Sequence, residues 1–444
     1  MRFSWPRLRT ATVIFALAAA MFVVAGVVIT PSPAQQAEPP SRGAPVVSEI
    51  ASGADLAGSI RALQTRLDRL PGDSTAWASL GAAYVQQARI TGDPSFYPRA
   101  EGAFDRSLEE RPDRNDGALT GFASLAAARH DFAAAQRFAE EAKAINPYSA
   151  TNQGVLTDAL IELGRYDEAF TELQRMVDLK PGVPSFSRVS YAWELRGETE
   201  PARKALEQAL EMAFNDSDAA FVSFYLGELE WNSGDLDAAA EHYANGLRRD
   251  PTYVPLLAGK AKIAAARGDV ETAVAGYDAV VRRLPEPSYV IEYADLLAAL
   301  GRDEAASSQY ALVQATGKLF EEAGVEVDLE FVLFDADHGR ASAALAAAQA
   351  LYDRRQSIHT EDAFAWALHV NGRDRQALAH AEAAAQLGTD SALFAYHRGM
   401  IEKSLGMDAK AQKSLRRSLA LNPHFSPLHA PRAEAALEEL ALSS

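Results

Sequence analysis

The stretch LIELGRYDEA, residues 160–169, carries the pattern that decides the fold of this 444-residue chain. Gly164 follows an apolar helical pattern, and glycine ends a helix readily because it accepts the left-handed backbone without a Cβ penalty. Ala169, five residues later, lies one turn into the next helix, where a small side chain lets two helices approach closely. The stretch therefore predicts a turn between two packed helices.

The same glycine and alanine recur along the chain at a nearly constant spacing. Seven further glycines follow at intervals of 33 to 38 residues, and each has an alanine five residues later. They are Gly197, Gly234, Gly268, Gly301, Gly339, Gly372 and Gly406. A helix-turn-helix unit of this length cannot bury its apolar face alone, so such units stack on their neighbours. We expect an all-α solenoid.

Prolines mark where the second helix of most units ends. A proline lacks the amide hydrogen and restricts the residue before it, so it stops a helix. These prolines are Pro112, Pro147, Pro181, Pro251, Pro285 and Pro423, whereas the unit that ends near Phe214 has none. Between Val313 and Asp337 the register stretches, and apolar residues alternate from Val325 to Phe331. Alternation is typical of a strand, but the flanking helices favour a helix there.

The residues of the first unit resemble the tetratricopeptide repeat. Trp77, Leu80, Gly81 and Tyr84 have the family's spacing for the first helix, and Ala100, Phe104 and Pro112 have it for the second. About ten such units fit between Ser74 and Pro423, roughly four fifths of the chain. The resemblance implies a right-handed superhelical solenoid. With the N-terminus considered below, the chain is similar to envelope-anchored or exported bacterial members of that family.

Five segments follow from these patterns. Residues 1–30 form a membrane anchor or signal sequence, 31–50 a Pro-rich disordered linker, 51–73 a capping helix, 74–423 the repeat array and 424–444 a C-terminal capping helix. The linker combines five prolines with small and polar residues, a composition that does not bury enough surface to offset the entropy of ordering. The two capping helices are expected at about Ala54–Leu70 and Ala430–Leu442.

The N-terminus has the composition of a membrane signal. Arg2, Arg7 and Arg9 precede the uncharged run Thr10–Thr30, TATVIFALAAAMFVVAGVVIT. About 20 apolar residues in a helix span a bilayer, which favours an uncleaved transmembrane helix. The small residues at 32–34 leave a cleaved signal open as the alternative. We expect a single-pass protein of the cell envelope with the repeats outside the cytoplasm, or else a secreted protein.

Composition excludes several function classes. The net charge of −17 opposes nucleic acid as the main partner. The chain has no cysteine, which rules out disulfides, thiolate metal sites and cysteine nucleophiles. Asp335, Asp337 and Gly339 resemble the start of a calcium loop, but Arg340 and Ala346 stand where that loop needs glycine and glutamate. We therefore expect no enzyme activity, no cofactor and no metal.

The resemblance also implies where a partner protein would bind. In tetratricopeptide arrays the first helices line a concave groove. Transferring those groove positions gives Tyr191, Glu194, Phe221, Phe224, Glu228, Trp231, Asp295, Trp366, His369, Tyr396, Met400 and Lys403. Large aromatic rings in such a groove would anchor a peptide or a helix. The alternative is that these rings only pack between adjacent units.

Three function classes are compatible with the sequence. The favoured one is a non-enzymatic scaffold of the envelope that binds a protein partner in its concave groove. The second is a structural solenoid that assembles with itself. The third is an enzyme with an unrecognised site, which the fold does not exclude.

Overall fold

The computed structural model describes residues 12–13, 53–326 and 329–442, and this part of the chain is an array of helices. Ten antiparallel helix pairs, the units, lie between a first helix α1 (Gly53–Arg69) and a last helix α22 (His429–Leu442). Units 1 to 5 are α2 (Ser74–Thr91) with α3 (Phe96–Glu110), α4 (Asp116–Ala128) with α5 (Phe132–Ile145), α6 (Ala150–Glu162) with α7 (Tyr166–Leu179), α8 (Val183–Glu194) with α9 (Thr199–Glu211), and α10 (Asp216–Asn232) with α11 (Leu236–Arg249). Units 6 to 10 are α12 (Val254–Ala266) with α13 (Val270–Arg283), α14 (Pro287–Ala299) with α15 (Asp303–Glu322), α16 (Leu329–Asp337) with α17 (Ala341–Tyr352), α18 (Ile358–Val370) with α19 (Asp374–Ala384), and α20 (Ala392–Ser404) with α21 (Asp408–Leu421). The predicted all-α solenoid is confirmed.

The turns within the units have the predicted backbone. All eight glycines of the repeat adopt φ between 68° and 80°. Each of the six prolines lies two residues beyond the last residue of a second helix. In unit 2 the left-handed position is taken by His130, with φ of 61°, so the turn that the glycine pattern misses has the same geometry.

Two glycines on adjacent first helices admit one large ring between them. Phe104 is fully buried, and a Cβ on Gly81 or Gly121 would lie 2.4 or 2.1 Å from its ring. Tyr243 occupies the equivalent place between Gly227 and Gly259. Because the ring of one second helix packs on two first helices, each unit covers its neighbour. This is a repeat of the tetratricopeptide type.

The stretched region after Val313 is helical. α15 extends to Glu322, and α16 begins at Leu329 after a turn at Gly324. Val332 and Phe334 of α16 are buried. Of the apolar residues that alternate in sequence, Val325 lies just after the turn, and Leu329 and Phe331 belong to α16.

The predicted N-terminal membrane segment and linker fall outside the described residues, apart from Thr12 and Val13. These two form a short strand, β1, that pairs in parallel with β2 (Thr389–Asp390) between α19 and α20. Among the described helices, none has both the length and the apolarity that crossing a membrane requires. The transmembrane helix stays a prediction.

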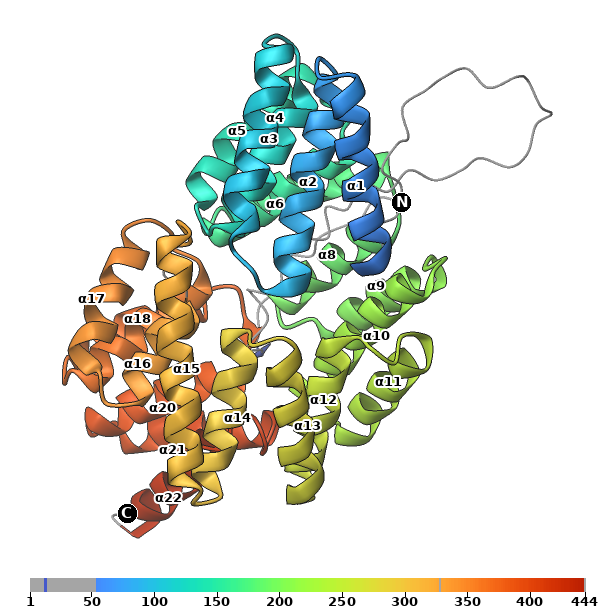
Figure 1. Cartoon of the computed structure of the whole chain (residues 1–444). Coiled ribbons are helices and arrows are strands. Elements are labelled where there is room, and N and C mark those ends of the chain that lie inside the picture. The colour runs from blue at the N-terminus through green and yellow to red at the C-terminus, as the bar shows by residue number, and fades with distance from the viewer. Residues whose placement is uncertain (1–11, 14–52, 327–328, 443–444) are drawn as a thin grey trace.

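The array winds far enough to touch itself, as the return of the orange helices beside the cyan ones shows in Figure 1. Residues 191 to 194 positions apart meet at several points. Arg355 bonds to Glu162 at 2.5 Å, both side chains being almost fully buried. The amide of Ile358 donates to Tyr166 Oη at 2.8 Å. Units 1 to 5 thus form a first superhelical turn and units 6 to 10 a second, and we call their contact the seam.

The seam joins first helices end to end. The last residues of α4, α6, α8 and α10 face the segments that precede α16, α18, α20 and α22. The acceptors on the first superhelical turn are Arg129 O, Glu162, Leu195 O and Trp231 O. Their donors on the second turn are, in the same order, Glu326 N, Arg355, Thr389 Oγ1 and Asn422 Nδ2. Acceptors on the first turn meet donors on the second, as expected when helix carboxyl ends face helix amino ends.

Candidate interaction site at the seam

At the α2 end of the seam the two superhelical turns approach each other, and within the described residues no hydrogen bond or ion pair joins them there. A Cβ on Gly92, which ends α2, would lie 3.1 Å from Leu284 Cδ1, so unit 1 reaches the turn before α14 (Figure 1). Arg89, in the last turn of α2, interacts electrostatically with Tyr97, Tyr253 and Glu286. The Arg89 guanidinium makes no hydrogen bond or ion pair to any other described residue.

We name this group the Arg89 cluster. Its members come from both turns and are Arg89, Tyr97, Tyr225, Tyr253, Glu286 and Tyr289. Among the described residues, the hydroxyls of Tyr97, Tyr253 and Tyr289 have no hydrogen-bond partner. All three side chains are partly exposed. The cluster therefore offers several polar groups that protein atoms leave unsatisfied, beside aromatic faces.

Desolvation shapes the charges of this cluster. Burial lowers the pKa of the Arg89 guanidinium. Burial also raises the pKa of Tyr97 and of Tyr253 to about 12, so both hydroxyls are protonated donors at neutral pH. The Glu286 side chain is exposed, yet burial of its surroundings raises its pKa, against the opposing charge of Arg89.

Six of the twelve groove residues predicted from the sequence lie on α8 and α10. Tyr191, Phe224 and Trp231 are each less than 10% exposed and belong to one hydrophobic cluster, with Phe221 packed against it. That cluster includes Ile358 and Phe394 of the second turn. Glu228 is buried and accepts from Lys262 Nζ at 2.7 Å. Glu194 accepts from Ser190 Oγ, and burial raises its pKa to about 7.

Four of the predicted residues of units 9 and 10 form a second group with the last helix. Trp366 donates to Asp337 at 2.7 Å and stacks on His397, with ring centres 4.2 Å apart. His369 also stacks on Trp366, at 4.9 Å. Tyr396 is 1% exposed, and Met400 packs against the same hydrophobic cluster. Here the rings pack between adjacent units.

Two predicted residues lie apart from both groups. Asp295 accepts from Tyr310 Oη at 2.9 Å and contacts His338 Nε2 at 3.1 Å. Lys403 pairs with Glu439 of α22. Whether any of the twelve binds a partner stays a prediction. In the closed array, the buried ones are covered by the protein itself.

The sequence analysis missed the Arg89 cluster. Arg89 and Tyr97 are distant in sequence from Tyr253 and Tyr289, and only the closure of the superhelix brings them near one another. The signal that was present is the extended turn between α2 and α3, which is longer than the turn inside every later unit except unit 4.

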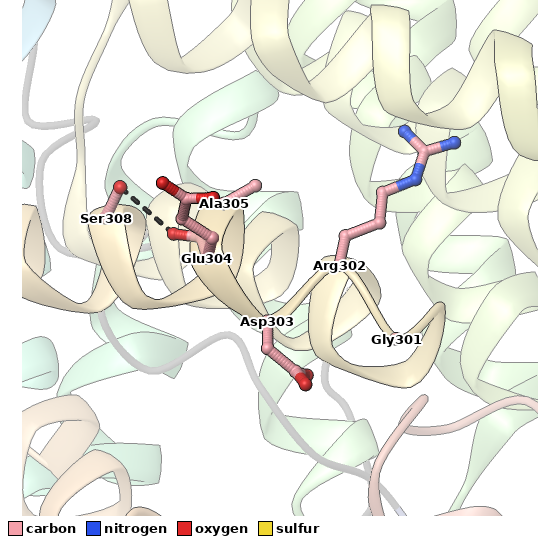
Figure 2. A pocket seen from close by; sticks show the side chains of 6 residues that line it. All are labelled: Gly301, Arg302, Asp303, Glu304, Ala305 and Ser308. Atoms are coloured by element: carbon pink, nitrogen blue, oxygen red, sulfur yellow. Dashed lines mark hydrogen bonds between the residues drawn. The ribbon is translucent and has the colours of Figure 1, made fainter.

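A shallow depression lies on the second superhelical turn, on the side away from the seam. Figure 2 shows it at the turn between α14 and α15, lined by Gly301, Arg302, Asp303, Glu304, Ala305 and Ser308. Its only drawn hydrogen bond runs from Ser308 Oγ to the Glu304 carbonyl. The lining residues come only from this turn and the start of α15, so polar groups do not converge from distant elements as a ligand site needs. The described part of the chain holds no group of acidic or histidine side chains fit for a metal ion.

Comparisons with known proteins bear on the repeat type alone. No family model matches the chain, and no curated protein matches it. Among solved structures, it is similar to a thermophilic TPR protein of Thermus thermophilus, with 22% identity over 41% of this chain and 98% of that one and a TM-score of 0.37. It is also similar to yeast Tom70, with 16% identity over 89% and 88% and a TM-score of 0.36. The Cut9–Hcn1 assembly of the APC/C gives 14% identity over 81% and 76% and a TM-score of 0.40. At such values these likenesses carry nothing about partners.

Proposed function

We propose that the chain is a non-enzymatic scaffold that binds a segment of a partner protein at the Arg89 cluster. One observation carries this proposal: a guanidinium and three tyrosine hydroxyls belong to one electrostatically linked cluster at the seam and have no hydrogen-bond partner among the described residues. Buried or half-buried polar groups are costly when unsatisfied, so a ligand that bonds to them gains affinity. Arginine and tyrosine are also the side chains most often dominant at protein interfaces.

A peptide or a short helix suits this site better than a small metabolite. The cluster is spread over α2, α3, α10 and the starts of α12 and α14, so an occupant must span several units. Phe221 of the predicted groove adjoins the cluster through Tyr225, with ring centres 4.6 Å apart. Phe221 therefore adjoins the cluster, and a partner bound at the cluster would extend along α10.

Photocrosslinking from single positions tests the binding proposal. A photoreactive amino acid at Tyr253 should give a discrete crosslinked protein in cells, and Arg89→Ala should remove that product. A photoreactive residue at Glu207, on the exposed face of α9, is the matched position outside the site. The same products from both positions, or a product indifferent to Arg89→Ala, would contradict binding at the cluster.

We also propose that the scaffold acts in the cell envelope, tethered through Thr10–Thr30 with the repeats outside the cytoplasm; in the tethered protein Thr12 and Val13 would leave their pairing with β2. The support is the basic N-terminus followed by an uncharged run long enough to span a bilayer. Fractionation followed by protease treatment of spheroplasts tests it. Membrane-associated repeats that are digested from outside are expected, and full protection inside intact spheroplasts would count against it.

A further inference from the structure

The seam leaves two edges of the superhelix uncovered, and these edges have opposite character. The seam uses the turns inside units 1 to 5 and the turns between units 6 to 10. Since turns alternate between the two edges of a helical array, the turns between units 1 to 5 and the turns inside units 6 to 10 lie on the free edges. We call these the amino edge and the carboxyl edge, after the ends of the first helices that they carry.

The carboxyl edge repeats the acceptors that the seam uses. In the seam, the carbonyls of Arg129 and Leu195, which cap α4 and α8, accept bonds from the other turn. The capping carbonyls on the carboxyl edge are those of Arg267, Leu300, Asn371 and Leu405. Within the described residues, none of these four carbonyls receives a hydrogen bond. A row of helix carboxyl ends is therefore left open.

Glycines confirm that this edge has no neighbour within the described chain. A Cβ on Gly164 or Gly234, at the seam, would lie 2.5 or 2.6 Å from a backbone carbonyl of the second turn. A Cβ on Gly301, Gly372 or Gly406, on the carboxyl edge, would meet nothing within 4 Å of the described residues. The backbone geometry is the same in both places, and only the neighbour is missing.

The amino edge offers donors and exposed rings at the repeat spacing. Arg114, Tyr148 and Phe214 each precede the residue that caps a first helix, and Lys180 lies in the corresponding turn of unit 4. Tyr148 is 79% and Phe214 81% exposed. The side chains of Arg114, Tyr148 and Lys180 have no partner among the described residues. The nearby acids Asp116 and Asp216 are already bonded to Asn146 and Arg249.

We propose that copies of this chain stack head to tail, with the amino edge of one on the carboxyl edge of the next. The interface would repeat the arrangement of the seam, where helix carboxyl ends meet helix amino ends. Its contacts match in spacing, since Tyr148 and Phe214 lie two units apart, as do the open turns at Gly339 and Gly406. Contacts between two different edges are heterologous, so each copy keeps one free edge of each kind and stacking continues unless the rotation between copies closes a ring. The proposal does not depend on the Arg89 cluster.

The absence of native cysteine allows a direct test with single-cysteine variants of the full-length chain in a mild non-ionic detergent. Tyr148→Cys and Phe214→Cys mark the amino edge, Arg340→Cys and Asp408→Cys mark the carboxyl edge, and Glu207→Cys on α9 is the control. Two differently tagged variants are mixed and oxidised. Amino-edge with carboxyl-edge mixtures should form the mixed disulfide at least tenfold more than either with the control.

A second measurement guards against damage from the cysteines. Light scattering of the wild type should show a mass that rises with concentration, and Tyr148→Ser with Phe214→Ser should hold the chain at its lowest mass. Leu319→Ser removes an exposed apolar side chain from α15 and should leave association unchanged. A wild type of constant monomer mass, or amino-edge pairs that crosslink as well as mixed pairs, would overturn the proposal.

Discussion

Phe104 is the side chain on which the packing of the first two units depends. It is fully buried between Gly81 and Gly121, which leave room for the ring and nothing else. Phe104→Ala should cost about 3–5 kcal/mol, because it opens a cavity between rigid helices. Hydrogen exchange should accelerate in α2 to α4 and much less in α18 to α21. Phe214→Ala, at an exposed ring, should change stability by less than about 0.5 kcal/mol.

Arg355 holds the seam through a buried charge. Its guanidinium bonds to Glu162 and lies 4.9 Å from the Phe132 ring centre. Arg355→Met should cost about 3–5 kcal/mol, because the buried Glu162 carboxylate loses its cation. The amide of Ile358 should exchange faster as the seam loosens. Adding Glu162→Gln to the same variant should restore much of the protection, and unchanged exchange in Arg355→Met would show that the ion pair does not hold the seam.

At the scale of the elements, two glycines with the same backbone conformation distinguish the strain of the turn from the contact across the seam. Gly164 has φ of 75° and Gly268 has φ of 76°. An alanine at either position should cost roughly 1–2 kcal/mol of left-handed strain. Only Gly164→Ala also collides with Gln356 O. We expect both variants to lose local protection at their own turn, but only Gly164→Ala to expose the Ile358 amide to exchange. Equal exchange at Ile358 in the two variants would mean that the glycine contact is not part of the closure.

These elements show what the sequence predicts and where it stops. Some features act within one unit or between two neighbours: turn glycines, helix-ending prolines and small residues under large rings. Their spacing in the sequence therefore predicts the repeat. His130 was missed because the left-handed position usually belongs to glycine. The seam was missed for a different reason. It depends on the small rotation between successive units summed over more than five of them, and no local pattern encodes that sum.

At the scale of the whole molecule, the seam changes how the array behaves. An open solenoid is held by contacts between neighbours only. Here unit 3 also depends on unit 9, through Glu162 with Arg355 and Tyr166 with Ile358. Leu415→Ala, at a fully buried position in unit 10, should therefore accelerate exchange in α8 and α10 as well as in α20. In the Arg355→Met background that distant effect should shrink, and its persistence would point to coupling along the chain instead.

Acid should open the closed array through His359. This histidine is buried in the seam, and its Nε2 lies 3.1 Å from Tyr191 Oη. Burial, with the nearby charge of Arg355, lowers its pKa to about 4. A histidine with a lowered pKa is neutral in the closed state. Its contribution to the stability of the closed array is therefore complete above about pH 6.5 and is lost as the pH falls towards 4. Between pH 6.5 and 5 the closed array should lose about 2 kcal/mol of stability.

Small-angle scattering should show the radius of gyration rising over that range. His359→Gln, which cannot titrate, should remove most of this pH dependence. A wild type and variant that expand alike would assign the opening to groups other than His359. Glu194 is not such a group, because burial raises its pKa to about 7 and its protonation therefore favours the closed array.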